Sequence, residues 1–272
     1  MPRLNACIFH QEDYSIESIV RKFLTAGFDG MEMSRPPFYD KLTTSGTRKR
    51  FVEWMQEQRL SMYGFDCWVN VDPFSKLEET LESFAAAIDW AADLDLGFII
   101  SHDTVNEMNG DRSLGDVLKV NVDLFRRVAD MCLEKGLRLI FEPHPDMPSM
   151  NDEWGIDFVD QLGEGRPDGS VGILYDCCHY GVGQPATYVD AIRKLGRRIQ
   201  HVHFSDSDRE TYALHLPPGE GVLDLEAIVA SLKGVGFRGS LTCDLFNYPM
   251  LEDGARRSVG AIAEVERKLG LK

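Results

Sequence analysis

Four apolar runs in the second half of the sequence each end in a side chain that can bind a metal ion. They are LRLIFE, VGILYD, IQHVH and SLTCD, which end at Glu142, Asp176, His203 and Asp244. Consecutive ends lie about one βα unit apart, a unit that takes roughly 30 residues. Three carboxylates and an imidazole that converge are costly to remove from water unless a cation shares them. The pattern therefore predicts a bound divalent metal ion.

The apolar runs themselves indicate buried parallel strands. A parallel strand covered on both faces reads as a continuous run of Val, Ile and Leu, and α/β proteins carry their chemistry at the carboxyl ends of such strands. Strand-like and helix-like segments alternate along the whole chain. The expected strands are Leu4–Phe9, Gly30–Met33, Leu60–Phe65, Phe98–Ser101, Leu137–Phe141, Val171–Tyr175, Ile199–Phe204 and Ser240–Leu245. The expected helices include Ile16–Ala26, Arg48–Gln58, Leu77–Leu94, Leu114–Lys135, Pro185–Leu195, Leu225–Val235 and Asp253–Leu269.

Eight regular βα units favour a closed barrel over an open, doubly wound sheet. The chain of 272 residues has no long linker, so we expect one domain over residues 1–272. A (β/α)8 TIM barrel typically takes about 250 residues. Capping residues support the helix boundaries, with N-cap candidates before three helices and glycines after three. These are Ser15, Ser113 and Asp224, and Gly27, Gly136 and Gly236.

Composition excludes several function classes. The formal charge of −15 argues against a nucleic-acid partner and against anionic membrane surfaces, since both are bound by Lys and Arg. No apolar stretch is long enough to span a membrane and no signal peptide is evident. The six cysteines form no CxxC pair, which is typical of reduced thiols in the cytoplasm. They are Cys7, Cys67, Cys132, Cys177, Cys178 and Cys243.

Each proposed ligand has a structural alternative. Glu142 could pair with an arginine, and Asp176 could cap the helix that follows it. His201 lies on the same strand face as His203, so one of the two could be a core histidine. Asp244 is the weakest candidate taken alone. The conjunction at four successive strand ends favours a metal, and three oxygen donors with one imidazole suit Mn²⁺, Mg²⁺ or Co²⁺ better than Zn²⁺.

Side chains near other predicted strand ends are candidates for shaping a substrate pocket. Glu32, Asp66, Trp68 and His102 fall in this group, with a structural role as the alternative for each. Trp68 offers an aromatic face of the kind on which sugar rings stack. The segment PPGEGVLD, from Pro217 to Asp224, is expected to fold over the mouth of the barrel. A G-x-G-x-x-A match after Tyr180 lacks the strand-to-helix turn of a dinucleotide site.

The chain resembles the xylose-isomerase-like TIM-barrel superfamily, in particular the sugar phosphate isomerase/epimerase group with its inosose isomerases and ketose 3-epimerases. The motifs AGFDGMEM, IFEPHP, YDCCH, HVHFSD, PGEGVLD and GSLTCDLF occur in the family's order. The resemblance implies that Glu142, Asp176, His203 and Asp244 bind the metal. It prefers His203 to His201 because an acidic residue, Asp206, follows three positions later. It also implies that His179 and Arg209 contact substrate oxygens.

Two positions depart from the family pattern. Most relatives carry Glu as the last ligand where this chain has Asp244, which can still bind a metal but has a shorter reach for a substrate proton. A further glutamate of the epimerases has no counterpart, because Pro148 stands at that position. The second departure argues against a close ketose 3-epimerase and favours the inosose-isomerase side of the group.

The expected reaction is an isomerisation or epimerisation of a keto-sugar or inosose through an enediolate. The metal polarises a chelated carbonyl, Glu142 removes the neighbouring proton, and Asp244 or water returns it. A lyase acting on a related keto-polyol, 3-dehydroshikimate or a 3-keto-glycoside is the main alternative. The chain has only seven histidines and a strongly acidic charge, and both features argue against an abasic-site endonuclease. A non-catalytic sugar-binding barrel is a further alternative. The resemblance also implies a homodimer or homotetramer.

Overall fold

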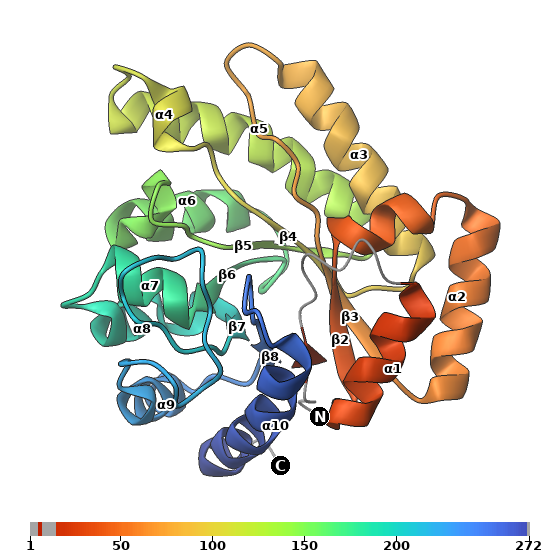
Figure 1. Cartoon of the computed structure of the whole chain (residues 1–272). Coiled ribbons are helices and arrows are strands. Elements are labelled where there is room, and N and C mark those ends of the chain that lie inside the picture. The colour runs from red at the N-terminus through yellow and green to blue at the C-terminus, as the bar shows by residue number, and fades with distance from the viewer. Residues whose placement is uncertain (1–4, 7–14, 271–272) are drawn as a thin grey trace.

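Eight parallel strands close into a barrel in the computed structural model, which describes residues 5–6 and 15–270 (Figure 1). Each strand pairs with the next along the chain, and β8 pairs with β1 to complete the ring. The predicted (β/α)8 TIM barrel is therefore confirmed. The strands are β1 (Asn5–Ala6), β2 (Gly30–Ser34), β3 (Ser61–Asp66), β4 (Phe98–Ser101), β5 (Arg138–Phe141), β6 (Val171–Asp176), β7 (Ile199–His203) and β8 (Ser240–Cys243).

Helices surround the strands, and α1 packs against α10 where the chain closes on itself (Figure 1). The α-helices are α1 (Ile16–Ala26), α2 (Ser45–Gln58), α3 (Leu77–Asp93), α4 (Asn106–Asn109), α5 (Leu114–Glu134), α6 (Asp152–Gly163), α7 (Cys177–Gly183), α8 (Tyr188–Leu195), α9 (Leu225–Gly234) and α10 (Leu251–Leu269). Three short turns complete the described elements: a π-helical turn over Arg35–Tyr39 and 3-10 turns over Pro148–Met150 and Gly196–Arg198.

Helix α1 illustrates how local sequence sets the elements. The Ser15 hydroxyl accepts a hydrogen bond from the Ser18 backbone N–H, which caps the first turn. The buried side chains recur at three- and four-residue steps, so one stripe faces the barrel. The helix ends at Gly27, whose φ of 102° is a left-handed conformation that favours glycine. The caps predicted at Ser113 and Asp224 are confirmed in the same way.

The predicted helices and strands recur with shifts of a few residues at their ends. Of the predicted first strand, only Asn5–Ala6 lies within the described residues. Helix α6 is not among the helices expected from the sequence, and it contains Gly155. That glycine is required by packing, since a Cβ there would lie 2.8 Å from the backbone oxygen of Ser149. Helix α8 starts three residues later than the predicted Pro185.

A small apolar cluster from β4, β5 and β6 lies next to the residues of the site. It consists of Phe98, Ile100, Ile140 and Leu174, and the ring of Phe98 lies 5.0 Å from that of His201. Within residues 15–270 no helix combines the length and apolar character that crossing a bilayer requires. The five cysteines of this range are buried and unpaired, while Cys7 lies outside the described residues.

Candidate metal centre

The four predicted metal ligands meet at the carboxyl ends of β5 to β8. Nδ1 of His203 is the centre of the group: it lies 2.9 Å from Oε1 of Glu142, and 3.5 Å from Oδ2 of both Asp176 and Asp244. All four side chains are at most 3% exposed. Adjacent parallel strands end at one edge of the barrel, so residues far apart in sequence become neighbours there.

Several of these donor atoms have no hydrogen-bond partner. Within the described part of the chain, Nδ1 of His203, Oδ2 of Asp176 and Oδ1 of Asp244 are buried and make no hydrogen bond, although the first two lie within ion-pair distance of each other. Ligand atoms of Glu142, Asp176 and His203 all lie within 4.8 Å of one another. Buried charges of one sign are costly unless a cation shares them. The donor set therefore fits a divalent metal ion.

Asp176 serves two purposes at once. Its Oδ1 accepts a hydrogen bond of 2.7 Å from the His179 backbone N–H and so caps α7. Its Oδ2 is the atom that faces His203 without a hydrogen bond. The capping role and the proposed ligand role, which are alternatives at the level of sequence, are thus compatible because each uses a different oxygen.

Electrostatics favour ionised carboxylates around His203. Burial acts to raise the pKa of Glu142, but the charge of His203 and the nearby ring of His144 hold it well below its usual range. Burial acts to lower the pKa of His203, but the charges of Glu32 and Glu142 raise it well above its usual range. A proton on His203 therefore partly offsets the carboxylates, and a metal ion has to displace it.

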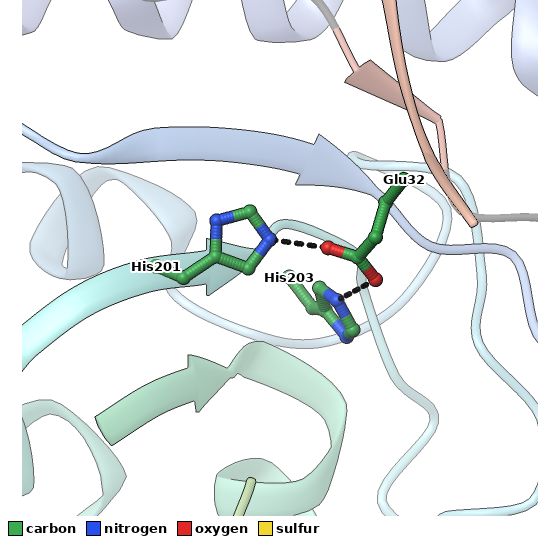
Figure 2. Close-up of side chains that lie close together, drawn as sticks. All are labelled: Glu32, His201 and His203. Carbon is green, nitrogen blue, oxygen red and sulfur yellow. Dashed lines mark hydrogen bonds and ion pairs between the residues drawn. The ribbon is translucent and has the colours of Figure 1, made fainter. Parts of the chain in front are cut away.

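Glu32 lies behind His203 rather than in the cavity, where the sequence placed it as a substrate-binding candidate. Its Oε1 is 3.1 Å from Nε2 of His203 and its Oε2 is 2.6 Å from Nε2 of His201 (Figure 2). Burial acts to raise the pKa of Glu32, but the charges and hydrogen bonds of the two histidines lower it to about 2. The reason for this placement is that Glu32 is in the interior of β2, below the strand's end.

A cavity of about 220 Å³ opens in front of the four donors. No Lys or Arg occurs among the described residues that line it. The lining consists of acidic, histidine and aromatic side chains with one methionine: Asp66, Trp68, His102, Glu142, His144, Asp146, Met147, His179, Tyr212, His215, Asp244 and Phe246. A larger hollow of about 790 Å³ lies at the opposite, amino ends of β6 and β7, away from these donors.

Two of the predicted substrate-binding histidines line this cavity as neutral rings. Burial and the nearby charge of His144 lower the pKa of His102 to about 4. Burial, together with His144 and His215, lowers the pKa of His179 to about 3, against the opposing effect of Asp176. Nδ1 of His179 is buried without a hydrogen bond and lies 3.8 Å from Oε1 of Glu142. Both rings can therefore donate to or accept from a neutral hydroxyl.

Trp68 forms an aromatic wall at the rim of the cavity. It is 43% exposed, and its ring stacks on that of Phe246 with a centroid distance of 6.4 Å and an angle of 22°. Its indole N–H donates to Oδ2 of Asp66 over 2.6 Å. The backbone of Trp68 adopts a φ of 42°, a left-handed conformation that costs roughly 1–3 kcal/mol in a non-glycine residue. The wall is held in place by contacts on two sides.

Arg209, the remaining predicted substrate contact, lies away from the cavity. Its side chain is exposed, and the guanidinium carbon lies 5.0 Å from the centroid of the Tyr188 ring. In this position the cation–π contact holds Arg209 on the outside of the loop that follows β7. Its predicted role would require this loop to rearrange.

The loop between β7 and α9 brings Tyr212 and His215 into the cavity, whereas the predicted mouth segment 217–224 is not part of the lining. Asp206 holds the loop together. Its Oδ1 accepts hydrogen bonds from the backbone N–H groups of Ser207 and Leu223, and its Oδ2 accepts one of 3.0 Å from Gly219. Asp206 also forms an antiparallel bridge with Leu216.

We expect Asp206→Ala to destabilise the protein by at least about 3 kcal/mol, because three backbone N–H groups lose their acceptor and each buried, unpaired donor costs about 1–3 kcal/mol. Urea unfolding followed by circular dichroism measures the change. Asp206→Asn keeps the Oδ1 acceptor and is expected to cost clearly less. Equal losses in the two variants would contradict this role for Asp206.

Sequence reasoning missed several lining residues. His144 stands two positions after Glu142 in the quoted motif IFEPHP, and His215 stands two positions before Pro217, the first residue of PPGEGVLD, so both were close to quoted segments. Oδ2 of Asp244 lies 2.9 Å from Nδ1 of His215, while Nε2 of His215 lies 3.1 Å from the Tyr212 carbonyl oxygen. In the sequence, the one hint of the contact between His215 and Asp244 was that His215 lies close to the segment 217–224, which was expected at the mouth of the barrel.

Comparisons with known proteins agree with the fold. A family model described as a xylose isomerase-like TIM barrel matches residues 20–265. The inosose dehydratase of Geobacillus thermodenitrificans is 22% identical over 286 residues, covering 95% of this chain and 91% of that protein. The fructoselysine 3-epimerase of Shigella flexneri is 24% identical over 248 residues, covering 87% of each. A solved structure of the IOLI protein with a bound zinc atom superposes with a TM-score of 0.81 at 17% identity, covering 98% of this chain and 99% of that one.

Proposed function

The chain belongs to the xylose isomerase-like TIM barrel family, and from this premise we propose that it is a divalent-metal-dependent isomerase or epimerase of a keto-sugar or inosose. Relatives that align with most of the chain are named as an inosose dehydratase and a fructoselysine 3-epimerase. Both names support an enzyme that acts on a small sugar-like molecule. The resemblance seen in the sequence motifs thus agrees with the family.

One observation carries the proposal: three carboxylates surround Nδ1 of a single histidine at the bottom of a cavity. Glu142 and Asp244 line that cavity, while Asp176 and His203 lie directly behind them. An arrangement that served structure alone would be expected to pair these charges with arginines or lysines. Here their charged partners are the histidines His203 and His215, and several of the buried atoms make no hydrogen bond, which supports a catalytic role instead.

Glu142, Asp176, His203 and Asp244 would hold the metal ion. When bound, a divalent ion there would polarise a substrate carbonyl and stabilise the negative charge that develops on its oxygen. The oxygen-rich donor set suits Mn²⁺, Mg²⁺ or Co²⁺. Zn²⁺ also accepts histidine and carboxylate ligands, and a neighbour of the same fold holds zinc, so we keep it among the candidates.

The side chains of the cavity supply the proton transfers. Glu142 is ionised and lies against the cavity, so it is the proposed base that removes the proton next to the carbonyl. Asp244, or a water molecule beside it, returns the proton to the neighbouring carbon or to the opposite face. The neutral rings of His102 and His179 would hold substrate hydroxyls while the enediolate forms.

The substrate is proposed to be one uncharged sugar or cyclitol ring. Ligand pockets for drug-sized molecules measure about 300–1,000 Å³, so a cavity of 220 Å³ fits a smaller molecule. A phosphate group would meet acidic residues and, among the described lining residues, no Lys or Arg. Trp68 offers an apolar face for the ring. A cytoplasmic location and a homodimer or homotetramer remain predictions.

A lyase is the second candidate, supported by the relative named inosose dehydratase, which aligns with 95% of the chain. Dehydration starts with the same proton removal next to a carbonyl. It differs in the next step, because a hydroxyl on the neighbouring carbon leaves instead of a proton returning. The same residues can support both outcomes, so the reaction has to be assigned by its product.

We expect an isomerase or epimerase to incorporate deuterium from D₂O into the carbon next to the carbonyl, because the proton passes through an exchangeable carboxyl group. Inososes and ketoses are incubated with the protein and Mn²⁺, Mg²⁺, Co²⁺ or Zn²⁺, and followed by NMR and ultraviolet absorbance. Deuterium without new absorbance supports the isomerase. An unsaturated product with new absorbance would assign the lyase, and no turnover of any substrate would count against both.

A further inference from the structure

Glu32 is a fully buried carboxylate that faces two histidines and no solvent. Its two oxygens lie on Nε2 of His203 and Nε2 of His201, and its exposure is 0% (Figure 2). The network spans three strands, since Glu32 comes from β2, both histidines come from β7, and Thr242 of β8 lies 3.1 Å from Nε2 of His201. None of these residues lines the cavity.

The contacts of Glu32 determine which nitrogen of His203 faces the cavity donors. A carboxylate oxygen accepts hydrogen bonds, so Nε2 of His203 carries a proton that it donates to Oε1 of Glu32. Nδ1 then points at Glu142, Asp176 and Asp244. Only this orientation, with Nε2 protonated, leaves Nδ1 available to bind a cation.

We propose that Glu32 is a positioning residue for the metal centre: it orients His203 through Nε2, and His201 anchors the other oxygen of the same carboxylate. The inference rests on the proposed function, because it takes the cation to lie on the Nδ1 side of His203. Histidine ligands of metals commonly donate their second N–H to a carboxylate, which orients the ring and raises its basicity. His201 is then an anchor for Glu32 rather than a ligand.

A cation held by Glu32, His201 and His203 themselves is the competing arrangement, since their ligand atoms also lie within 4.8 Å of one another. It would require both Nε2 atoms to give up their protons and both hydrogen bonds to Glu32 to break. It would also place the ion behind the cavity, next to the ring of Phe98, where a substrate could not reach it. The Nδ1 side opens toward the cavity through Glu142 and Asp244.

Metal titration of the full-length protein tests the proposal. In Glu32→Gln the side chain keeps its size, but its amide can accept a hydrogen bond from only one of the two histidines. We expect the dissociation constant for Mn²⁺ to rise about 10–100-fold, as for other outer-shell carboxylates. Glu57→Gln, the same change at an exposed position of α2, is expected to bind as the wild type does. An unchanged Mn²⁺ affinity in a folded Glu32→Gln variant would overturn the proposal.

Loss of all Mn²⁺ binding in Glu32→Gln with binding retained in Glu142→Gln would also overturn it, because that result places the ion beside Glu32. A ¹⁵N-labelled sample gives a second readout without metal. We expect the wild-type His203 ring to carry a hydrogen-bonded, slowly exchanging proton on Nε2. Absence of a proton on this nitrogen would refute the proposal. If the wild type binds no metal, the proposed function fails, yet the Nε2 proton still decides the role of Glu32.

Discussion

Glu142→Gln is expected to lower turnover by at least about 10²–10⁴-fold, the usual contribution of a positioned general base. Glutamine has nearly the same shape, but its amide cannot take up the substrate proton. It also weakens the metal centre, because Oε1 of Glu142 lies 2.9 Å from Nδ1 of His203. The deuterium-exchange assay measures the loss with whichever substrate the wild type turns over.

Circular dichroism provides the control for folding, since the barrel strands do not depend on this side chain for their pairing. Glu142→Asp is the informative companion variant: it keeps a carboxylate and is expected to retain more activity than the glutamine variant. Measuring the turnover of both variants at saturating Mn²⁺ separates the effect of weakened metal binding from the effect of the missing base. A Glu142→Gln protein that kept most of its turnover would exclude Glu142 as the base.

Removing divalent cations is expected to abolish turnover and lower the melting temperature by about 5 °C or more. A ligand at 100 times its dissociation constant stabilises the folded state by about 2.7 kcal/mol, and each kcal/mol shifts the melting temperature of a 150–250-residue domain by about 2–4 °C. Without the ion, Glu142, Asp176 and Asp244 also repel one another. Scanning calorimetry before and after a chelator, and after adding back Mn²⁺, Mg²⁺, Co²⁺ or Zn²⁺, measures the effect.

His203→Gln is the matched control for this experiment. It removes the nitrogen on which the three carboxylates converge, so its melting temperature is expected to change little when metal is added. Activity should return with the same ions that restore the melting temperature of the wild type. If the chelator leaves turnover unchanged, the result would contradict the proposed metal centre.

The fold could be predicted because the patterns that determine its helices and strands are local in the sequence. Continuous apolar runs and helical stripes recur at the spacing of a βα unit, and capping residues such as Ser15 set the boundaries. Helix α6 was not among the expected helices, and its Gly155 packs against the backbone oxygen of Ser149, a contact that no local pattern contains. The convergence of the four strand-end side chains was predictable for the same reason as the strands, because each of these residues ends or directly follows an apolar run.

The role of Glu32 depends on how deep it lies in the barrel, and the role of His215 depends on the conformation of its loop. Neither can be read from the spacing of residues in the sequence. Glu32 occurs inside β2 and therefore lies below the cavity, while His215 reaches it from a loop organised by Asp206. The six histidines of the described range all lie in or directly behind the cavity or its donors. Their small number is therefore no argument against a metal-rich site, whereas the charge of −15 still disfavours nucleic acid.

The apolar cluster of Phe98, Ile100, Ile140 and Leu174 contacts His201, which lies behind the proposed metal ligands. In the proposed reaction, the ion, the reactant and the product would enter and leave through the cavity that Trp68 borders. The four proposed ligands are almost fully buried whereas Trp68 is 43% exposed, so a bound ion would lie deeper than the reactant. If the proposed metal centre is correct, the ion would be expected to bind before the reactant and to dissociate after the product has left.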